Sequence, residues 1–210
     1  MNKICLILQG ASDYVNIIKE KYKNTDIQII FSTWKGEESK YNENDIVIFN
    51  KMPQESGVQN VMLQQLTTYN GLLKAKELGF QNAIKIREDT YFDDLSLFLK
   101  NDIDFNKVNF LYFLDYHRIY GPDKKNNNYK YFCDYIQIGS VDNLLKMWDF
   151  KYSQCYYAEQ LISKHIFNTF KKEDIAFIGN YVTNDCDIYL ISRKLYLSTL
   201  DRTYYKINIS

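Results

Sequence analysis

The chain has no excess of charge of either sign. Its 210 residues include 26 basic and 26 acidic side chains, and the formal net charge at neutral pH is zero. A protein that binds a nucleic-acid backbone depends on a positive surface to attract the phosphates. The balanced charge therefore argues against nucleic acid as a partner.

Long apolar runs are missing too. The longest apolar run near the N-terminus covers residues 4–8, whereas a helix that spans a bilayer needs about 20 residues. We see no series of basic, apolar and small residues that would indicate a signal peptide. The four cysteines lie far apart without a CxxC pair, which favours buried, reduced thiols. We therefore expect a cytoplasmic protein with no transmembrane segment.

Several catalytic signatures are absent. The sequence contains no G-x-S-x-G, no P-loop and no G-x-G-x-x-G, which removes the simplest hydrolase, nucleoside-triphosphatase and dinucleotide-binding interpretations. His117 and His165 are the only histidines, and neither has an Asp, Cys or Glu at the spacing of a metal-ligand motif. A structural role is the more ordinary interpretation for both.

The composition is otherwise that of a globular protein rich in aromatic residues. Apolar residues make up 46% of the chain and charged residues 25%, which is close to average usage. A single domain of this length buries about 70% of the surface of its unfolded chain. The 19 Tyr and 13 Phe indicate mainly core packing, although such rings also stack on sugars and bases.

The first 90 residues alternate between strand and helix patterns. Apolar runs predict buried strands at residues 3–10, 26–33, 45–50 and 80–86. Helical spacing of apolar residues predicts a helix over residues 15–22, capped by Ser12 or Asp13, and a long helix over residues 56–79. This alternation predicts a single α/β domain with a Rossmann-like, mixed and mostly parallel sheet flanked by helices.

The second half of the chain is less regular. Its patterns predict a short helix at residues 93–100, strands at 108–116 and 131–140, a helix capped by Asp142, and a further helix at 157–170.

The predicted strand at residues 80–86 ends in three charges, Arg87, Glu88 and Asp89. Ligands of open α/β sheets bind just beyond the carboxyl ends of the strands. In an extended chain Arg87 and Asp89 project to one face and Glu88 to the other. Asp89 could then bind Mg²⁺ or Mn²⁺ while Arg87 contacts a phosphate. A salt bridge between Arg87 and Asp89 is the alternative, and residue chemistry alone favours it.

Other candidate residues carry weaker signals. The pattern Asp-x-Asp occurs at residues 102–104, where we expect a solvated loop at the opposite end of the sheet, and at 185–187, which is a minor alternative metal site. Gly10 could let a phosphate or a base approach the backbone, or could serve only a turn. Trp34 could stack on a base or a sugar, or belong to the core.

Six segments together resemble the WavE lipopolysaccharide-synthesis family of bacterial glycosyltransferases, and they occur in the order of that family. They are LILQG at residues 6–10, IIFSTWKGE at 29–37, QQLTTYNGLLKAK at 64–76, AIKIRED at 83–89, DYIQIGSVDNLLKMWDF at 134–150 and AEQ at 158–160.

The resemblance implies a GT-A-like glycosyltransferase. Such an enzyme would move a sugar from a nucleotide sugar to a surface glycan, either lipopolysaccharide or capsule, with the help of Mg²⁺ or Mn²⁺. Residues 1–100 would bind the nucleotide sugar and residues 101–210 the acceptor. The acceptor would be an oligosaccharide or a lipid-linked glycan, so the protein would be able to contact the inner face of the cytoplasmic membrane peripherally.

The resemblance also assigns site residues. Asp89 would bind the metal, and Asp134 and Glu159 are the candidates for the base that takes the acceptor proton. An acidic residue such as Glu159 in a first helical turn is favourable in its own right, whereas a carboxylate at Asp134 in an apolar strand needs a partner or a purpose. The residues expected to bind the nucleotide sugar are Gln9, Gly10, Trp34, Gln64 and Arg87.

The chain departs from the family pattern at two positions. Leu63 stands where arginine is usual, and Ala11 where proline is common. The loss of this arginine keeps open a catalytically silent relative that binds a saccharide or a partner protein. A phosphotransferase or nucleotidyltransferase, which would share the metal site, is the other alternative.

Overall fold

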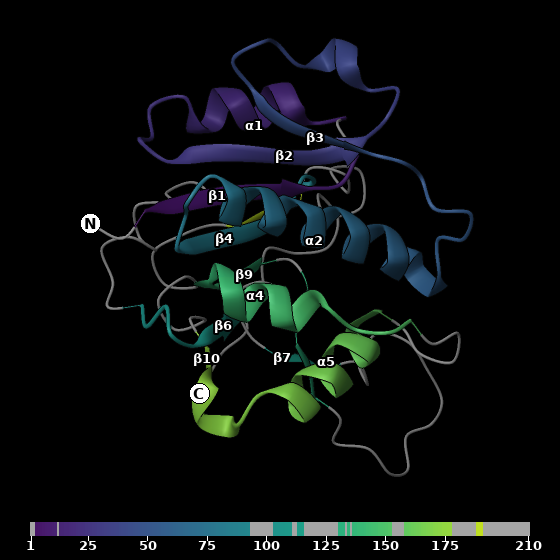
Figure 1. Ribbon diagram of the computed structural model, residues 1–210, viewed down its shortest axis with the longest axis vertical. Helices are drawn as coiled ribbons and strands as arrows, with labels where there is room; N and C mark the ends of the chain where they lie inside the picture. The colour runs from purple at the N-terminus through teal and green to yellow at the C-terminus, as the bar shows by residue number, and fades with distance from the viewer. Residues whose placement is uncertain are drawn as a thin grey trace.

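A seven-stranded sheet forms the centre of the molecule in the computed structural model (Figure 1). The structure describes residues 3–11, 13–92, 103–110, 113–115, 130–132, 134, 136–152, 158–177 and 188–190. The strand order is β10-β6-β9-β4-β1-β2-β3. The strands are β1 (Ile4–Gln9), β2 (Gln28–Trp34), β3 (Ile46–Asn50), β4 (Asn82–Arg87), β6 (Val108–Phe110), β9 (Ile136–Ser140) and β10 (Ile175–Phe177).

One strand of this sheet runs against the others. β9 pairs antiparallel with both β4 and β6, while all other neighbours in the sheet are parallel. β1 and β4 are buried along nearly their whole length, as strands covered on both faces require. The predicted mixed, mostly parallel α/β sheet in a single domain is confirmed.

Helices cover both faces of the sheet. α1 (Val15–Tyr22) packs on the face that carries Leu6 and Leu8. The other face carries Ile7 and meets α2 (Val61–Glu77) and α4 (Val141–Trp148), which lie in front of the sheet in Figure 1. α5 (Ala158–Thr169) packs beside α4. Short 3₁₀ turns occur at η1 (Glu38–Lys40), η2 (Val58–Asn60) and η4 (Lys172–Asp174).

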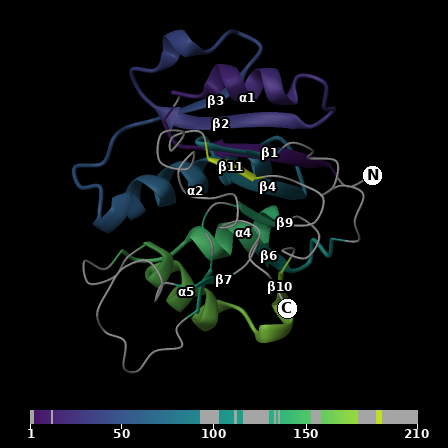
Figure 2. The same cartoon turned by 180° about the vertical axis from the view of Figure 1, so that it is seen from behind.

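Two small antiparallel ribbons accompany the main sheet. β5 (Thr90–Phe92) pairs with β11 (Ile188–Leu190), and β7 (Phe113–Asp115) pairs with β8 (Lys130–Phe132). β11, in yellow, lies behind the sheet in Figure 1 and in front of it in Figure 2. β5 starts directly after Asp89 and follows β4 after a two-residue turn.

Two strand predictions in the second half were wrong in their extent. Residues 108–116 contain β6 and β7, and residues 131–140 contain parts of β8 and β9; in each case the two strands belong to different sheets. An apolar run shows only that its residues are buried. It carries no mark of the point where the chain changes from one sheet to another.

Helix boundaries also differ in detail from the predictions. α2 starts at Val61 after a 3₁₀ turn, and Gly79 follows it with the positive φ of +79° expected of a helix stop. Tyr14, not Asp13, is the N-cap residue of α1. Ser140 replaces Asp142 as the cap of α4, because its hydroxyl accepts the Asn143 N–H. Ser12 and the predicted helix at 93–100 lie outside the described residues.

The sequence predicts no transmembrane segment. In the part of the chain that the structure describes, no helix combines the length and apolar character that a membrane crossing requires.

Candidate functional site

The candidate site lies where three parallel strands end. Gln9 is the last residue of β1, and in the β1–β4 register it stands opposite Arg87, the last residue of β4. Trp34 ends the neighbouring strand β2. Parallel strands of an open sheet bring their carboxyl ends to one edge, where ligands bind.

A cavity of about 330 Å³ opens at this edge. The first turn of α2 and the loop between β1 and α1 complete its wall. Its lining consists of Gln9, Gly10, Ala11, Asp13, Tyr14, Trp34, Asn60, Leu63, Gln64, Arg87, Glu88 and Asp89. All five residues predicted to bind the nucleotide sugar, together with the predicted metal ligand Asp89, therefore lie in one cavity. Their roles stay predictions.

Arg87 and Asp89 form a two-point ion pair in the cavity wall. Arg87 Nε donates to Asp89 Oδ1 at 3.0 Å, and Arg87 Nη2 donates to Oδ2 at 2.6 Å. Both side chains keep partial access to solvent, with 29% and 16% of their surface exposed. The salt-bridge interpretation is therefore correct, and it does not exclude the functional one, because the pair faces the cavity.

A second carboxylate lies behind the arginine. Asp134 Oδ2 lies 3.6 Å from Arg87 Nη1, and the Asp134 side chain is 2% exposed. Asp134 occupies a bend between β8 and β9. The prediction that it lies inside a strand is therefore wrong. Its carboxylate does not line the cavity.

Lys85 is a buried cation close to the site that was not among the predicted site residues. It lies two residues before Arg87 on β4 and is inaccessible to solvent. Its Nζ donates to the backbone carbonyl of Asp134 at 2.6 Å and lies 4.9 Å from the centre of the Trp148 ring. Lys85, Arg87 and Asp89 share one face of the chain, so two cations precede the carboxylate along this side of the site. A lysine inside an apolar strand was the available signal.

Glu88 projects to the opposite face, as predicted. Its Oε1 accepts the backbone N–H of Tyr14 at 3.2 Å, and the residue is 9% exposed. Burial raises the pKa of this carboxyl to about 8. The hydrogen bond from Tyr14 opposes that rise in pKa, and the charges of Glu37 and Asp13 add to it.

Charges on the outer side of the loop form a small network. Lys40 Nζ lies 3.2 Å from Asp13 Oδ1 and 3.6 Å from Glu37 Oε1. Glu37 in turn accepts the Thr33 hydroxyl and, at 3.4 Å, the Trp34 backbone N–H. These contacts connect the loop after β1 with the chain after β2, so two walls of the cavity support each other.

The remaining predicted site residues lie elsewhere. Glu159 falls in the first turn of α5, and its side chain is outside the described part of the structure. Asp104 is exposed before β6, at the end of the sheet opposite to the cavity, as predicted. Asp102, Asp185 and Asp187 are outside the described residues, and so is His117. The His165 ring contacts the Lys146 carbonyl at 2.8 Å.

The donor atoms present limit how a metal could bind. Among the described residues no three His, Cys, Asp or Glu side chains come together as a metal site. Asp89 offers one carboxylate, which Arg87 already contacts. Mg²⁺ is often bound by one or two carboxylates together with substrate phosphates. The residues therefore fit a divalent cation that arrives mainly with a diphosphate, and not one held by the protein alone.

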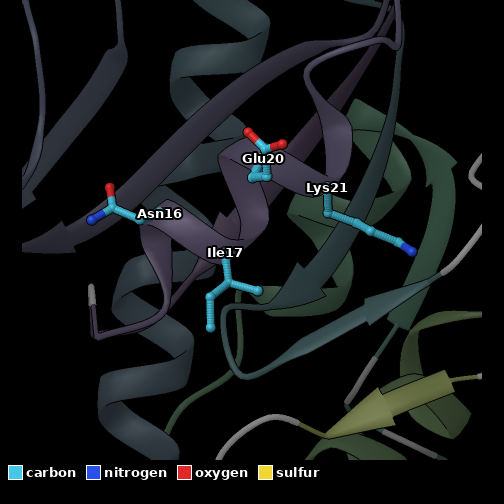
Figure 3. A pocket seen from close by; sticks show the side chains of 4 residues that line it. All are labelled: Asn16, Ile17, Glu20 and Lys21. Carbon is cyan, nitrogen blue, oxygen red and sulfur yellow. The ribbon is translucent and has the colours of Figure 1, made fainter.

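A second hollow, of about 520 Å³, lies on the outer side of α1. Asn16, Ile17, Glu20 and Lys21 line it, and Figure 3 shows their side chains spreading in different directions from this one helix. Convergent polar groups are what fix a ligand. We therefore place the candidate site at the strand ends.

Comparison with known proteins places the fold. No family model and no curated protein matches the chain. A solved glycosyltransferase involved in the glycosylation of the major capsid of PBCV-1 matches with a TM-score of 0.50 at 8% identity, over 82% of this chain and 81% of its own. The chain has a GT-A-like fold.

A second solved structure gives a similar match. It is the galactosyltransferase LgtC in complex with donor and acceptor sugar analogs, with a TM-score of 0.49, 12% identity, and coverage of 83% of this chain and 72% of that one. At these identities the likeness to the PBCV-1 enzyme concerns the GT-A-like fold alone, and function has to be argued from the site.

Proposed function

We propose that the chain is a glycosyltransferase that moves a sugar from a nucleotide sugar to a surface glycan. The observation that carries the proposal is the Arg87–Asp89 pair in the wall of a cavity at the carboxyl ends of β1, β2 and β4. A GT-A-like fold supports it. The cavity lining comes entirely from residues 9–89, within the part of the chain predicted to bind the donor.

Arg87 is suited to the leaving diphosphate. Transfer of the sugar releases a nucleoside diphosphate, and its developing charge must be stabilised by fixed cations or a metal. Asp89 and Asp134 contact the guanidinium on two sides, so its orientation is set before a ligand arrives. A planar guanidinium held in this way can contact a phosphate through two hydrogen bonds.

Asp89 would supply a protein ligand to Mg²⁺ or Mn²⁺. The bound cation would neutralise the diphosphate as a Lewis acid. Asp89 faces the cavity beside Arg87, so one carboxylate would orient both the guanidinium and the metal-bound diphosphate.

Gln9 and Gln64 provide acceptors for hydroxyl groups. Both line the cavity, and each has a buried side-chain oxygen with no hydrogen-bond partner among the described residues. Buried polar atoms of folded proteins are nearly always paired. Hydroxyl groups of the ribose or the sugar would donate hydrogen bonds to these two amide oxygens. The Trp34 ring, which lines the same cavity, would stack on the base or the sugar.

The base for the acceptor hydroxyl remains a proposal with two candidates. A base has to approach the proton to hydrogen-bonding distance, about 2.6–3.2 Å between heavy atoms. The contacts of Asp134 support a role in holding Arg87, because its side chain is almost wholly buried. Glu159 is the other candidate.

The acceptor proposal rests on the resemblance to the WavE family. It implies lipopolysaccharide or capsule as the acceptor, bound by residues 101–210 near the inner face of the cytoplasmic membrane. One observation favours a catalytically silent relative as a second candidate function. Leu63, which stands where arginine is usual in that family, lines the cavity, so the departure removes a cation from the site itself.

Calorimetry with UDP, GDP, CMP and dTDP, each with and without Mn²⁺, tests the proposal. We expect one nucleotide to bind and Mn²⁺ to strengthen its binding. With the corresponding nucleotide sugar, Asp89→Asn should reduce transfer at least about 100-fold, the scale of losing one group that stabilises the transition state. Asp104→Asn, at an exposed aspartate remote from the cavity, is the control and should retain transfer.

Three outcomes contradict parts of this proposal. A fully active Asp89→Asn protein would remove that residue from the mechanism. Binding of no nucleotide would favour the silent saccharide-binding or partner-binding relative. Release of a phosphorylated or nucleotidylated product, seen by phosphorus NMR, would identify a phosphotransferase or nucleotidyltransferase instead.

A further inference from the structure

We infer that Glu88 is a positioning residue that holds the loop between β1 and α1 against the end of β4, so that the loop and Arg87 form one binding site. This loop, called the donor loop below, covers residues 10–14 and contributes Gly10, Ala11, Asp13 and Tyr14 to the cavity lining. The inference rests on the proposed function for its ligand. The positioning itself can be measured without one.

Glu88 connects two elements that are far apart in the sequence. Its backbone N–H donates to the Gln9 carbonyl at 3.0 Å and so continues the contact between β1 and β4 past the last ladder pair. Its side chain then turns to the face opposite to Arg87, where Oε1 accepts the Tyr14 N–H at 3.2 Å. One residue therefore bonds both to the residue just before the donor loop and to the last residue of that loop.

The backbone of the donor loop lies directly against Glu88. Gly10 has a φ of +137°, and a Cβ added there would lie 3.5 Å from both Glu88 Cβ and Glu88 Oε2. The Gly10 N–H donates to the Ser32 carbonyl of β2 at 3.2 Å. The loop is thus fixed to β2 on one side and to Glu88 on the other.

The carboxyl group also serves the N-terminus of α1. Tyr14 makes no side-chain cap to this helix, and the first turn of α1 contains no acidic residue. The first N–H groups of a helix need acceptors from outside it. Glu88 provides such an acceptor to the Tyr14 N–H from a different strand.

Packing alone does not account for this arrangement. Placing a carboxyl in a largely buried position is unfavourable unless it makes hydrogen bonds, and an apolar side chain could fill the same space. Glu88 stands between Arg87 and Asp89 in the chain, so any shift of the donor loop relative to Glu88 is also a shift relative to the diphosphate-binding pair. If Arg87 binds the diphosphate, the donor loop, which lines the same cavity, would contact the nucleoside.

Three variants separate positioning from a general effect on folding. Glu88→Ala removes the acceptor, Glu88→Gln retains the Oε1 oxygen for the Tyr14 N–H, and Glu20→Ala is a control on the exposed side of α1. Amide hydrogen exchange is measured first, without any ligand. We expect Glu88→Ala to speed exchange at residues 10–18 at least about 10-fold while residues 83–86 stay protected. Glu88→Gln and Glu20→Ala should match the original protein.

Unchanged exchange at residues 10–18 in Glu88→Ala would overturn the inference. If Glu88→Ala does not fold, Gly10→Ala is the second variant. Alanine is strained at a φ of +137°, so this variant should move the donor loop away from Glu88. Faster exchange at residues 10–18 in Gly10→Ala would then support the inference, and unchanged exchange would overturn it.

Binding is measured next, with the nucleoside diphosphate identified by calorimetry and with inorganic pyrophosphate. We expect Glu88→Ala to lower the affinity for the nucleoside diphosphate at least about 10-fold and to change the affinity for pyrophosphate by less than about 2-fold. Glu88→Gln should bind both ligands like the original protein. Equal loss for both ligands would overturn the inference. If exchange responds as expected but the original protein binds no nucleotide, the positioning role stands and the proposed function fails.

Discussion

The charged residues in and just after β4 show how single side chains build the site. Lys85, Arg87 and Asp89 share one face of the chain. Lys85 contacts the Asp134 carbonyl, and Arg87 contacts the carboxylates of Asp134 and Asp89. The two cations balance the two carboxylates. Lys85 and Asp134 are buried, whereas Arg87 and Asp89 keep partial access to solvent. Removing the partner of a buried charge leaves that charge without compensation, which costs more than the pair itself contributes.

We predict that Lys85→Met lowers the free energy of unfolding by about 2 kcal/mol. Methionine keeps the length and most of the volume of the side chain. The loss of stability therefore measures the contribution of the ammonium group and its hydrogen bond to the Asp134 carbonyl. Urea denaturation followed by far-UV circular dichroism measures it.

Lys76→Met is the matched control for this prediction. Lys76 contacts Asp142 at 2.8 Å, but both side chains are more than half exposed, and such pairs contribute about 0–1 kcal/mol. Equal losses of stability in the two variants would show that the buried position of Lys85 does not matter.

At the scale of elements, the site depends on how closely α2 packs on the sheet. Gly71 lies in the middle of α2, and a Cβ added there would lie 2.7 Å from Ile7 Cγ2 and 3.3 Å from Ser32 Cβ. Without a side chain at this point the helix approaches β1 and β2 closely. That approach sets where the start of α2, with Leu63 and Gln64, and the preceding residue Asn60 meet the cavity.

We predict that Gly71→Ala destabilises the protein by up to about 2 kcal/mol. Alanine gains about 1 kcal/mol of helix propensity over glycine, but overpacking a well-filled core costs about 1–3 kcal/mol. Ile7 is fully buried and β-branched, so its methyl group cannot move aside easily. Thermal or urea unfolding measures the difference.

The control for this prediction is Lys74→Ala on the same helix. Lys74 forms an ion pair with Glu77 on the helix surface, and both side chains are partly exposed, so little change in stability is expected there. A Gly71→Ala protein more stable than the original would mean that propensity outweighs the contact with Ile7.

The sequence predicted the elements that follow a regular period. Alternation along β4 placed Arg87 and Asp89 on one face and Glu88 on the other, and the structure agrees. The break between β8 and β9 was missed, because both strands are apolar and the change of sheet falls at Asp134. The partner of Glu88 was missed as well. Tyr14 lies 74 residues away, and no local pattern reports a contact over that separation.

At the scale of the whole molecule, the two halves of the chain share one sheet and one core. β4, from the first 100 residues, pairs with β9 from the second part. A single apolar cluster contains Val61 and Leu72 from α2 together with Phe110 and Trp148. The Arg87–Asp134 contact crosses the same boundary. A donor half and an acceptor half would therefore be functional divisions within one folding unit.

We predict that both halves unfold in one cooperative transition. The chain has two tryptophans, and each lies in a different half: Trp34 ends β2 beside the cavity, and Trp148 ends α4 in the shared core. Trp148→Phe leaves Trp34 as the fluorescent reporter of the donor half. Trp34→Phe leaves Trp148 as the fluorescent reporter of the acceptor half. In urea, the emission midpoint of each variant should agree with its own circular dichroism midpoint within about 0.2 M. Unfolding of the Trp148 region at clearly lower urea would mean that the β4–β9 pairing does not couple the halves. The acceptor half could then reorganise while the Arg87–Asp89 site stays intact.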